Sequence, residues 1–240
     1  AAFVGATLLS LALVPLVRDY ARRREINDNP GGHKSHTAPV PYLGGVAMVV
    51  AFSSAMFVGV ILRRSAVIEG RQINLTIGNL FARGDGLLRE LLVVLGLAIA
   101  FSLMGLIDDL RGLSPSLRFT AGLGLAGALI SYGVKLDSPL PQPLDFVISV
   151  VWVLGITNAF NLLDNIDGLA AGVAAVASAA FFCIAVINDQ PYSALLAIGL
   201  AGAMLGFLRS NFHPATIYMG DAGSLFIGFM MAYLGLKMRT

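Results

Sequence analysis

The sequence predicts an all-α, polytopic helical membrane protein with about eight transmembrane helices. Hydrophobic residues make up 57% of its 240 residues and charged residues 12%, and the mean hydropathy is +0.80. Soluble domains average about 45–50% apolar and about 25% charged residues, whereas here apolar runs close to the roughly 20 residues of a bilayer span recur along the chain. An ordinary soluble domain, a disordered chain and a disulfide scaffold are therefore excluded. The net charge of +2 is too small to indicate a nucleic-acid partner.

Eight apolar segments are the candidate spans, and they belong to one membrane domain over residues 1–240. In chain order they are 1–17, 42–62, 87–107, 119–134, 144–163, 169–187, 193–208 and 225–240. The first runs into Arg18 without a small-residue cleavage site, so it is interpreted as a span and not as a signal peptide. The fourth and seventh segments are near the lower length limit for a span. Truncation is expected at both ends, because the chain lacks an initiating Met and stops within an apolar run.

If each segment crosses the bilayer once, the loops alternate between two faces. The first, which we call face A, receives the loops 18–41, 108–118, 164–168 and 209–224. All the histidines and the clustered Asp residues fall on face A: His33, His36, His213, Asp108, Asp109, Asp164, Asp167 and Asp221. Lys and Arg residues divide evenly between the faces, so the positive-inside rule gives no orientation. The chemistry is therefore expected at face A.

The stretch 158–168 carries the strongest signal. It contains Asn158, Asn161, Asp164, Asn165 and Asp167, followed by a glycine. If it is helical, the three amides form one stripe, with the first acid beside the second amide. Such groups at a membrane helix end are costly unless they find partners or a water-filled cavity. The alternative is a plain cap and turn, which needs only one or two such residues.

The adjacent acids Asp108 and Asp109 form the second stretch. Neighbouring side chains on a helix diverge by about 100°, so the two carboxylates are not expected to form one bidentate clamp. One could hold a divalent cation while the other orients a ligand or pairs with Arg111. The alternative is a solvated loop start that Arg111 stabilises.

The third stretch, 211–224, contains two glycines that allow close backbone approach and places Asp221 at the start of the last span. Free N–H groups at a helix N-terminus bind phosphate well, and an acid there suits a metal that bridges acid and phosphate. The alternative is that Asp221 or Ser224 is a plain N-cap.

The fourth stretch brings His33, Lys34 and His36 close to the paired glycines Gly44 and Gly45. Basic and imidazole groups beside glycines suit a diphosphate, although such a stretch is often simply a loop. Across all four stretches, carboxylate oxygens with few His and no nearby Cys favour Mg²⁺ or Mn²⁺ over zinc. The combination suggests transfer between a nucleotide-activated group and a lipid phosphate.

In this order, the stretches resemble the polyprenyl-phosphate N-acetylhexosamine-1-phosphate transferase family. The resemblance runs from about residue 33 to 228 and rests on three motifs: DDxxGLS from Asp108, NxxNLxDxxDGL from Asn158 and NFxPAxxxMGDxGS from Asn211. It implies a multi-pass enzyme of the bacterial inner membrane whose site faces the cytoplasm. Such an enzyme transfers a sugar 1-phosphate, here GlcNAc 1-phosphate, from a UDP-sugar to undecaprenyl phosphate with Mg²⁺, releases UMP and initiates cell-envelope glycan synthesis. The resemblance also allows a second copy of the chain as a partner, in a homodimer.

The resemblance also implies roles for individual residues. It makes Asp221 the metal ligand, joined by Asp108, and it makes Asp108 and Asp109 an acidic pair acting near the lipid phosphate. The predicted catalytic residues are Asp108, Asp109, Asp164 and Asp167, and the predicted substrate-binding residues are Lys34, Arg118, Asn161, Asp167 and Tyr218. Within the second set, Asn161 and Asp167 belong to the nucleotide side, Tyr218 stacks on uracil, and Lys34 and Arg118 lie near the diphosphate.

Two departures and two alternatives accompany the resemblance. Asn165 stands where many members have Gly, and the His-rich loop and last spans of the family should lie beyond Thr240, so this piece is expected to be inactive alone. The peptidoglycan branch, phospho-N-acetylmuramoyl-pentapeptide transferase, is an alternative, although it typically has TPTMGG where this chain has a Leu43-Gly44-Gly45 ending. A cation-coupled transporter is the other, but it would place its carboxylates near the bilayer midplane.

Overall fold

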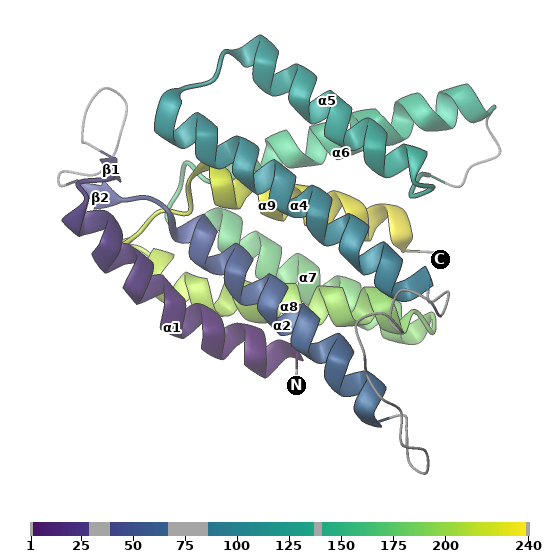
Figure 1. Ribbon diagram of the computed structural model, residues 1–240, viewed down its shortest axis with the longest axis horizontal. Coiled ribbons are helices and arrows are strands. Elements are labelled where there is room, and N and C mark those ends of the chain that lie inside the picture. The colour runs from purple at the N-terminus through teal and green to yellow at the C-terminus, as the bar shows by residue number, and fades with distance from the viewer. Residues whose placement is uncertain (1, 29–38, 67–85, 137–140, 239–240) are drawn as a thin grey trace.

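The computed structural model describes residues 2–28, 39–66, 86–136 and 141–238. Within these ranges the chain forms eight helices, one for each predicted apolar segment (Figure 1). They are α1 (Ala2–Arg23), α2 (Gly44–Ala66), α4 (Gly86–Arg111), α5 (Pro115–Ser131), α6 (Gln142–Leu163), α7 (Leu169–Ile187), α8 (Pro191–Asn211) and α9 (Gly220–Lys237). The predicted all-α membrane class is therefore confirmed.

Five of the described helices have the length and composition of a membrane span. They are α1, α4 from Leu88, α6, α7 and α8. Helix α2 contributes the apolar stretch Gly44–Val58 within the residues whose side chains the structure describes. The helix α5 has only 17 residues, as expected for a segment near the lower length limit. Five of the about eight predicted spans therefore meet both the length and the composition criteria over the described residues.

A very short strand pair is the only sheet within the described ranges. β1 (Asn27–Asp28) pairs antiparallel with β2 (Val40–Pro41), with Asn27 opposite Pro41. The chain then continues into α2 beside the segment that leads into α9, since the Tyr218 N–H donates to the Pro41 carbonyl over 2.9 Å and the Gly44 N–H donates to the Tyr218 carbonyl over 3.0 Å. These backbone bonds bring two predicted face-A loops together.

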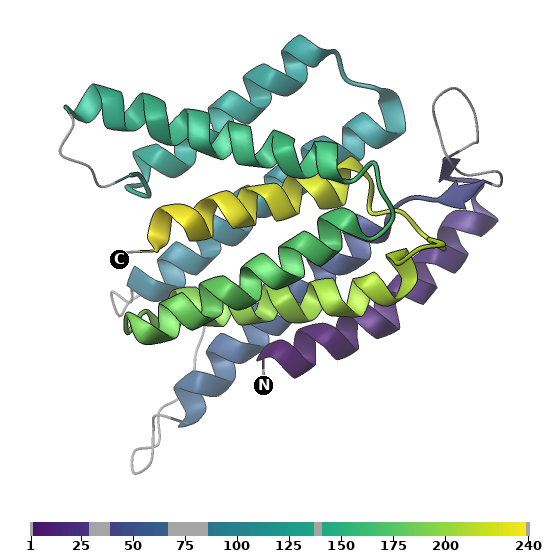
Figure 2. The same cartoon turned by 180° about the vertical axis from the view of Figure 1, so that it is seen from behind.

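Helix α9 is the centre of the molecule, and its residues from Ala222 to Leu234 are all buried. It is apolar all round apart from its ends, which is typical of a fully enclosed helix. In Figures 1 and 2, α4, α5 and α6 lie on one side of α9, and α2, α7 and α8 lie on the other, with α1 outside them. Phe101 of α4 stacks on Phe229 at 5.0 Å between ring centroids, and Phe52 of α2 meets Phe226 edge to face at 5.6 Å.

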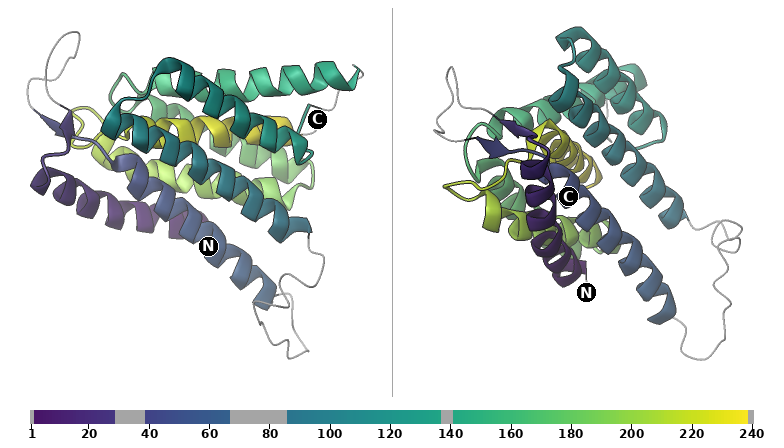
Figure 3. Two further views of the ribbon diagram at one scale, coloured as in Figure 1. Left: turned by 45° about the horizontal axis from the view of Figure 1, so that its top comes forward. Right: turned by 60° about the vertical axis from the view of Figure 1, so that its left-hand side comes forward.

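The helices alternate in direction, so the C-terminal ends of α1, α4, α6 and α8 gather with the N-terminal ends of α2, α5, α7 and α9 (Figure 3, left). This end is the predicted face A. At the opposite end, Lys237 of α9 pairs with Glu90 of α4 (Nζ to Oε1, 2.6 Å), and the Tyr233 hydroxyl donates to the same carboxylate over 2.8 Å. Polar contacts therefore join α4 to α9 at their far end as well.

Candidate active site

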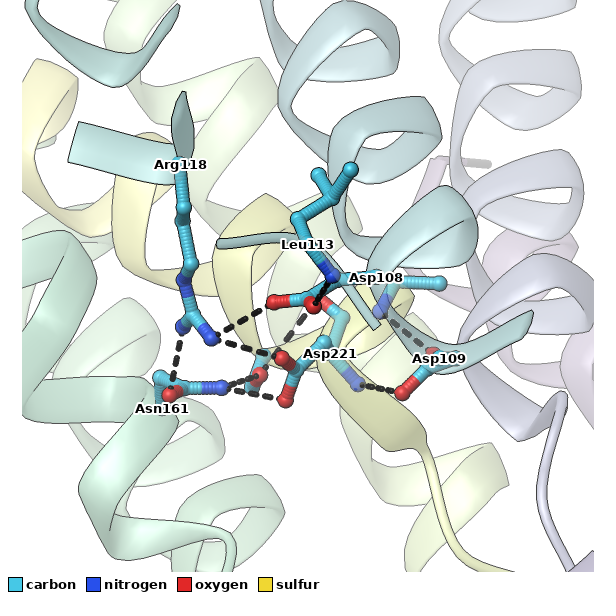
Figure 4. Close-up of polar contacts among 8 residues, drawn as sticks. Asp108, Asp109, Leu113, Arg118, Asn161 and Asp221 are labelled. Carbon is cyan, nitrogen blue, oxygen red and sulfur yellow. Dashed lines mark hydrogen bonds and ion pairs between the residues drawn. The ribbon is translucent and has the colours of Figure 1, made fainter. Parts of the chain in front are cut away.

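Arg118 is the centre of a polar cluster at the face-A end (Figure 4). Its Nη1 donates to Asp108 Oδ2 over 2.9 Å and to Asp221 Oδ2 over 2.8 Å. Its Nη2 donates to Asn161 Oδ1 over 2.6 Å. One guanidinium thus joins the end of α4, the start of α9 and the end of α6, and four residues predicted from sequence meet at one place.

Local sequence places each member of this cluster. Asp108 Oδ1 accepts the Leu113 N–H over 2.7 Å, which folds the chain back after α4. Ser114 then caps α5 by accepting the Leu117 N–H, and Pro115 fills the first turn, where a missing N–H costs nothing. Arg118 follows within one turn and reaches back to Asp108. The sequence hypothesis that Arg111 pairs with the acids is wrong, because the described contacts are made by Arg118.

Asn161 fixes the Asp221 carboxylate from the α6 side. Its Nδ2 donates to Asp221 Oδ1 over 2.6 Å and to Ser224 Oγ over 2.9 Å. Its Oδ1 accepts from Arg118, so one amide group binds both the guanidinium and the Asp221 carboxylate. The predicted stripe of three amides is shorter than expected: α6 ends at Leu163, so Asn165 lies beyond the helix and bonds only the Leu162 carbonyl.

Asp109 points away from Asp108, as the divergence of neighbouring side chains predicts. Its Oδ1 accepts the Asp221 N–H over 2.9 Å and its Oδ2 accepts the Ala222 N–H over 3.1 Å. These are N–H groups of the first turn of α9, so the prediction that they are free for phosphate is wrong. The plain N-cap alternative is wrong too, since Met219 precedes the helix without a side-chain cap bond and the capping carboxylate comes from α4.

Asp167 lies in a second contact set on the same face. Its Oδ2 accepts the Ala215 N–H over 3.1 Å and lies 2.9 Å from His213 Nδ1. Buried Asn211 ties the same two loops together, accepting from the Gly168 N–H and donating to the Ile217 carbonyl. The sequence reasoning did not assign roles to His213 and Asn211, although both stand in the third motif.

Asp164 is only partly exposed at the end of α6. Burial, followed by the nearby carboxylates of Asp221, Asp109 and Asp167, raises the pKa of Asp164 well above its ordinary value of 3.8. Carboxylates that raise one another's pKa create a site of strongly negative potential, which favours a cation.

The remaining predicted site residues divide into two groups. Tyr218 is held by the backbone bonds described above, and the Tyr42 hydroxyl beside it donates to the Asp109 carbonyl over 3.1 Å. Lys34, with His33 and His36, lies outside the described residues.

A cavity of about 590 Å³ opens beside the Arg118 cluster, between α4, α5, α6 and α9. Asp108, Arg118, Asn161 and Asp221 line its polar end. Apolar side chains line the rest, namely Phe101, Met104, Leu113, Phe119, Leu154, Leu162 and Leu225. The cavity therefore offers a charged end and an apolar wall to one ligand.

The cluster also has the ligand chemistry of a cation site. Among the described residues, no group of three or more His, Cys, Asp and Glu side chains converges on one point. Asp108, Asp221 and Asn161 nevertheless direct three oxygens at the Arg118 cation. Carboxylate and amide oxygens suit Mg²⁺, which commonly uses only one or two protein carboxylates. The residues present fit the predicted ion.

Comparison with known proteins gives a consistent picture. The family model described as glycosyl transferase family 4 matches residues 91–239. The probable undecaprenyl-phosphate N-acetylglucosaminyl 1-phosphate transferase of Bacillus subtilis is 31% identical over 98% of this chain and 62% of its own length. A decaprenyl-phosphate N-acetylglucosaminephosphotransferase of Mycobacterium leprae is 31% identical over 96% of this chain and 59% of its own.

A relative that is named for another substrate has a similar identity to this chain. The phospho-N-acetylmuramoyl-pentapeptide-transferase of Heliobacterium modesticaldum is 32% identical over 100% of this chain and 74% of its own length. The chain spans less than two thirds of the Bacillus and Mycobacterium relatives. The family model and these relatives confirm the resemblance found in the motifs, and the chain belongs to glycosyl transferase family 4.

Proposed function

We propose that the protein transfers an N-acetylhexosamine 1-phosphate, with GlcNAc as the sugar, from a UDP-sugar to a polyprenyl phosphate such as undecaprenyl phosphate. The observation that carries the proposal is the cavity with Arg118 and two carboxylates at its polar end and apolar side chains along its wall. A polyprenyl phosphate has the same division between a charged head and an apolar chain. The reactions for which the relatives are named support the same reaction class.

The reaction needs little covalent help from the protein. An oxygen of the lipid phosphate attacks the β-phosphorus of the UDP-sugar, and the bond from that phosphorus to the bridging oxygen breaks, so that UMP leaves with the electron pair. A phosphate monoester is largely dianionic at neutral pH, because its second pKa is about 6. Positioning and charge neutralisation therefore supply most of the rate. Arg118, with N–H groups already directed at three oxygens, is suited to hold the anionic head of the acceptor.

Asp221, Asp108 and Asn161 are the residues that would hold Mg²⁺. When bound, the ion supplies positive charge against the diphosphate. In this proposal Asp164, Asp167 and Tyr218 lie beside the nucleotide part of the UDP-sugar, and Lys34 lies near its diphosphate.

Orientation follows from the substrate. UDP-sugars are made in the cytosol, so face A is proposed to be cytoplasmic in the bacterial inner membrane. A homodimer remains a prediction. A transporter is disfavoured, because the described acids of the site lie at one end of the helices and not midway along them.

The experiment measures UMP release by the full-length protein in membrane vesicles that contain undecaprenyl phosphate and Mg²⁺. UDP-GlcNAc and UDP-N-acetylmuramoyl-pentapeptide are supplied separately, and the lipid products are identified by mass. We expect a GlcNAc-diphosphate lipid, and we expect the Asp221→Asn variant to release almost no UMP. Turnover of the pentapeptide donor alone would place the protein in the peptidoglycan branch, and turnover of neither donor would overturn the proposal.

A further inference from the structure

We propose that Asp109 is a positioning residue: its carboxylate fixes the N-terminus of α9, and thereby Asp221, without contact with the reacting groups. The two acids of the predicted pair then have different duties, Asp108 inside the cavity and Asp109 behind it. The kinetic part of this inference rests on the proposed function, whereas the structural part does not.

Both oxygens of Asp109 are already used by α9. They accept the N–H groups of Asp221 and Ala222 at 2.9 and 3.1 Å. A carboxylate at this point satisfies N–H groups that would otherwise lack a partner and opposes the positive end of the helix dipole. Met219, which precedes α9, makes no side-chain cap bond, so the cap comes from a residue 112 positions earlier in the chain.

Two glycines make this contact possible. Gly105, one turn before Asp109 on α4, lies so close to α9 that a Cβ there would collide with the Asp221 backbone carbonyl. Gly220 has a φ of 69°, and a Cβ on it would lie 2.6 Å from Asp109 Oδ2. The carboxylate and the two bare backbones therefore form one tightly fitted contact between α4 and α9.

The contact also sits behind the cavity and not inside it. Asp108 and Asp221 line the cavity, whereas Asp109 does not. The side chain of Asp221 is held from the cavity side by Arg118 and Asn161, while its backbone is held from behind by Asp109. The Tyr42 hydroxyl bonds the Asp109 carbonyl, which steadies the acid itself. Asp109 thus acts on the site through the backbone of Asp221.

The first test is hydrogen–deuterium exchange in the purified full-length protein, read on peptides covering residues 218–226. Asn at position 109 offers one acceptor oxygen where Asp offers two, so Asp109→Asn should speed exchange of the Asp221 and Ala222 amides by about tenfold or more. Asp108→Asn is the matched control, because Asp108 bonds Arg118 and Leu113 instead, and it should leave these amides unchanged. Unchanged exchange in Asp109→Asn would overturn the proposal. If that variant fails to fold, Asp109→Glu, which keeps both acceptors on a longer side chain, should exchange faster than wild type, and protection equal to wild type would count against the proposal.

The second test compares kinetics. Gly105→Ala displaces α9 without altering any acid, so it and Asp109→Asn should each lower kcat about tenfold or more, and the double variant should be no slower than the slower single variant. Gly96→Ala, on the same helix with open space around its Cβ, should keep kcat within about twofold. Multiplying effects in the double variant would show that Asp109 acts directly and overturn the proposal. A wild-type protein without transferase activity would count against the proposed function alone, since the exchange experiment judges the positioning contact independently.

Discussion

Arg118 and Asp221 are 103 residues apart in the sequence and are joined by an ion pair of 2.8 Å between Nη1 and Oδ2. The same Nη1 reaches Asp108 Oδ2 at 2.9 Å. An arginine that bridges two acids offsets one of their two negative charges and holds the two carboxylates close together.

Arg118→Lys should lower kcat/KM for the lipid acceptor by about tenfold to a hundredfold. Lysine keeps the charge, but its donors come from one nitrogen on a shorter side chain, so it cannot reproduce the contacts that Nη1 and Nη2 make with Asp108, Asp221 and Asn161. Charge-assisted hydrogen bonds contribute about 1.5–3 kcal/mol each. The measurement is UMP release over a range of undecaprenyl phosphate concentrations. Arg111→Lys is the control, because Arg111 is exposed, and it should stay within about twofold of wild type. Equal effects of the two substitutions would contradict the role of Arg118.

Asp167→Asn should raise the KM for the UDP-sugar about tenfold and change kcat by no more than about threefold. Asp167 contacts His213 and the Ala215 N–H and has no bond to the Arg118 cluster among the described contacts, so its loss should affect the proposed nucleotide side. Steady-state kinetics with varied UDP-GlcNAc provide the test. Asp19→Asn changes an exposed acid near the C-terminal end of α1 and should change neither constant. A large fall in kcat at unchanged KM would assign Asp167 to the chemical step instead.

Asp164→Asn should stabilise the protein at neutral pH and reduce its activity. The pKa of Asp164 is raised in the fold by burial and by neighbouring acids, so the folded state binds the proton more tightly than the unfolded state. Stability is therefore lost as pH rises from the ordinary value of 3.8 through the raised value. Removing the charge should increase Tm by about 2–4 °C or more near pH 7.5, and the gain should shrink as pH falls.

Thermal unfolding in detergent without Mg²⁺, followed at about pH 4.5 and about pH 7.5, measures this gain. Asp189→Asn changes an exposed acid in the loop between α7 and α8 and should leave Tm unaltered at both pH values. A Tm gain for Asp164→Asn that is larger at acid pH would contradict a raised pKa of Asp164 in the folded protein.

Labelling in cells tests the orientation of face A. In a Cys183→Ala background, which removes the native thiol, single cysteines at Glu25 and Asp189 occupy exposed loops at opposite ends of the helices. Both positions have positive φ, 56° and 50°, so the two variants carry comparable backbone strain. An impermeant thiol reagent added to intact cells should label position 189 and spare position 25 until the cells are permeabilised. The reverse pattern would place face A outside the cytoplasm.

Local sequence patterns are enough to predict the helices and the end of the bundle at which the clustered acids lie. Apolar runs specify membrane helices one at a time, and their alternation placed Asp108, Asn161 and Asp221 at one end. Contacts between distant helices are a different matter. The capping of α9 by Asp109 depends on how closely two glycine-bearing backbones approach, and no local pattern shows that distance. Similarly, only the family resemblance indicates a role for Arg118. Helix α6 ends before Asn165 because the chain turns there towards Gly168, which has a φ of 72° and directly precedes α7.

Polar contacts join α4 and α9 at both of their ends. Glu90 and Asp108 are 18 positions apart on one continuous helix, which corresponds to roughly 27 Å at a rise of about 1.5 Å per residue. That length is close to the hydrocarbon thickness of a bilayer, about 30 Å. The polar contacts at the two ends of this helix pair are therefore separated by about the distance between the two headgroup regions of a bilayer. In the proposed reaction, the phosphate of the polyprenyl acceptor would lie at the depth of Asp108 while its chain stays in the hydrocarbon. Bilayers much thinner or thicker than about 30 Å would then hold the phosphate away from the acids.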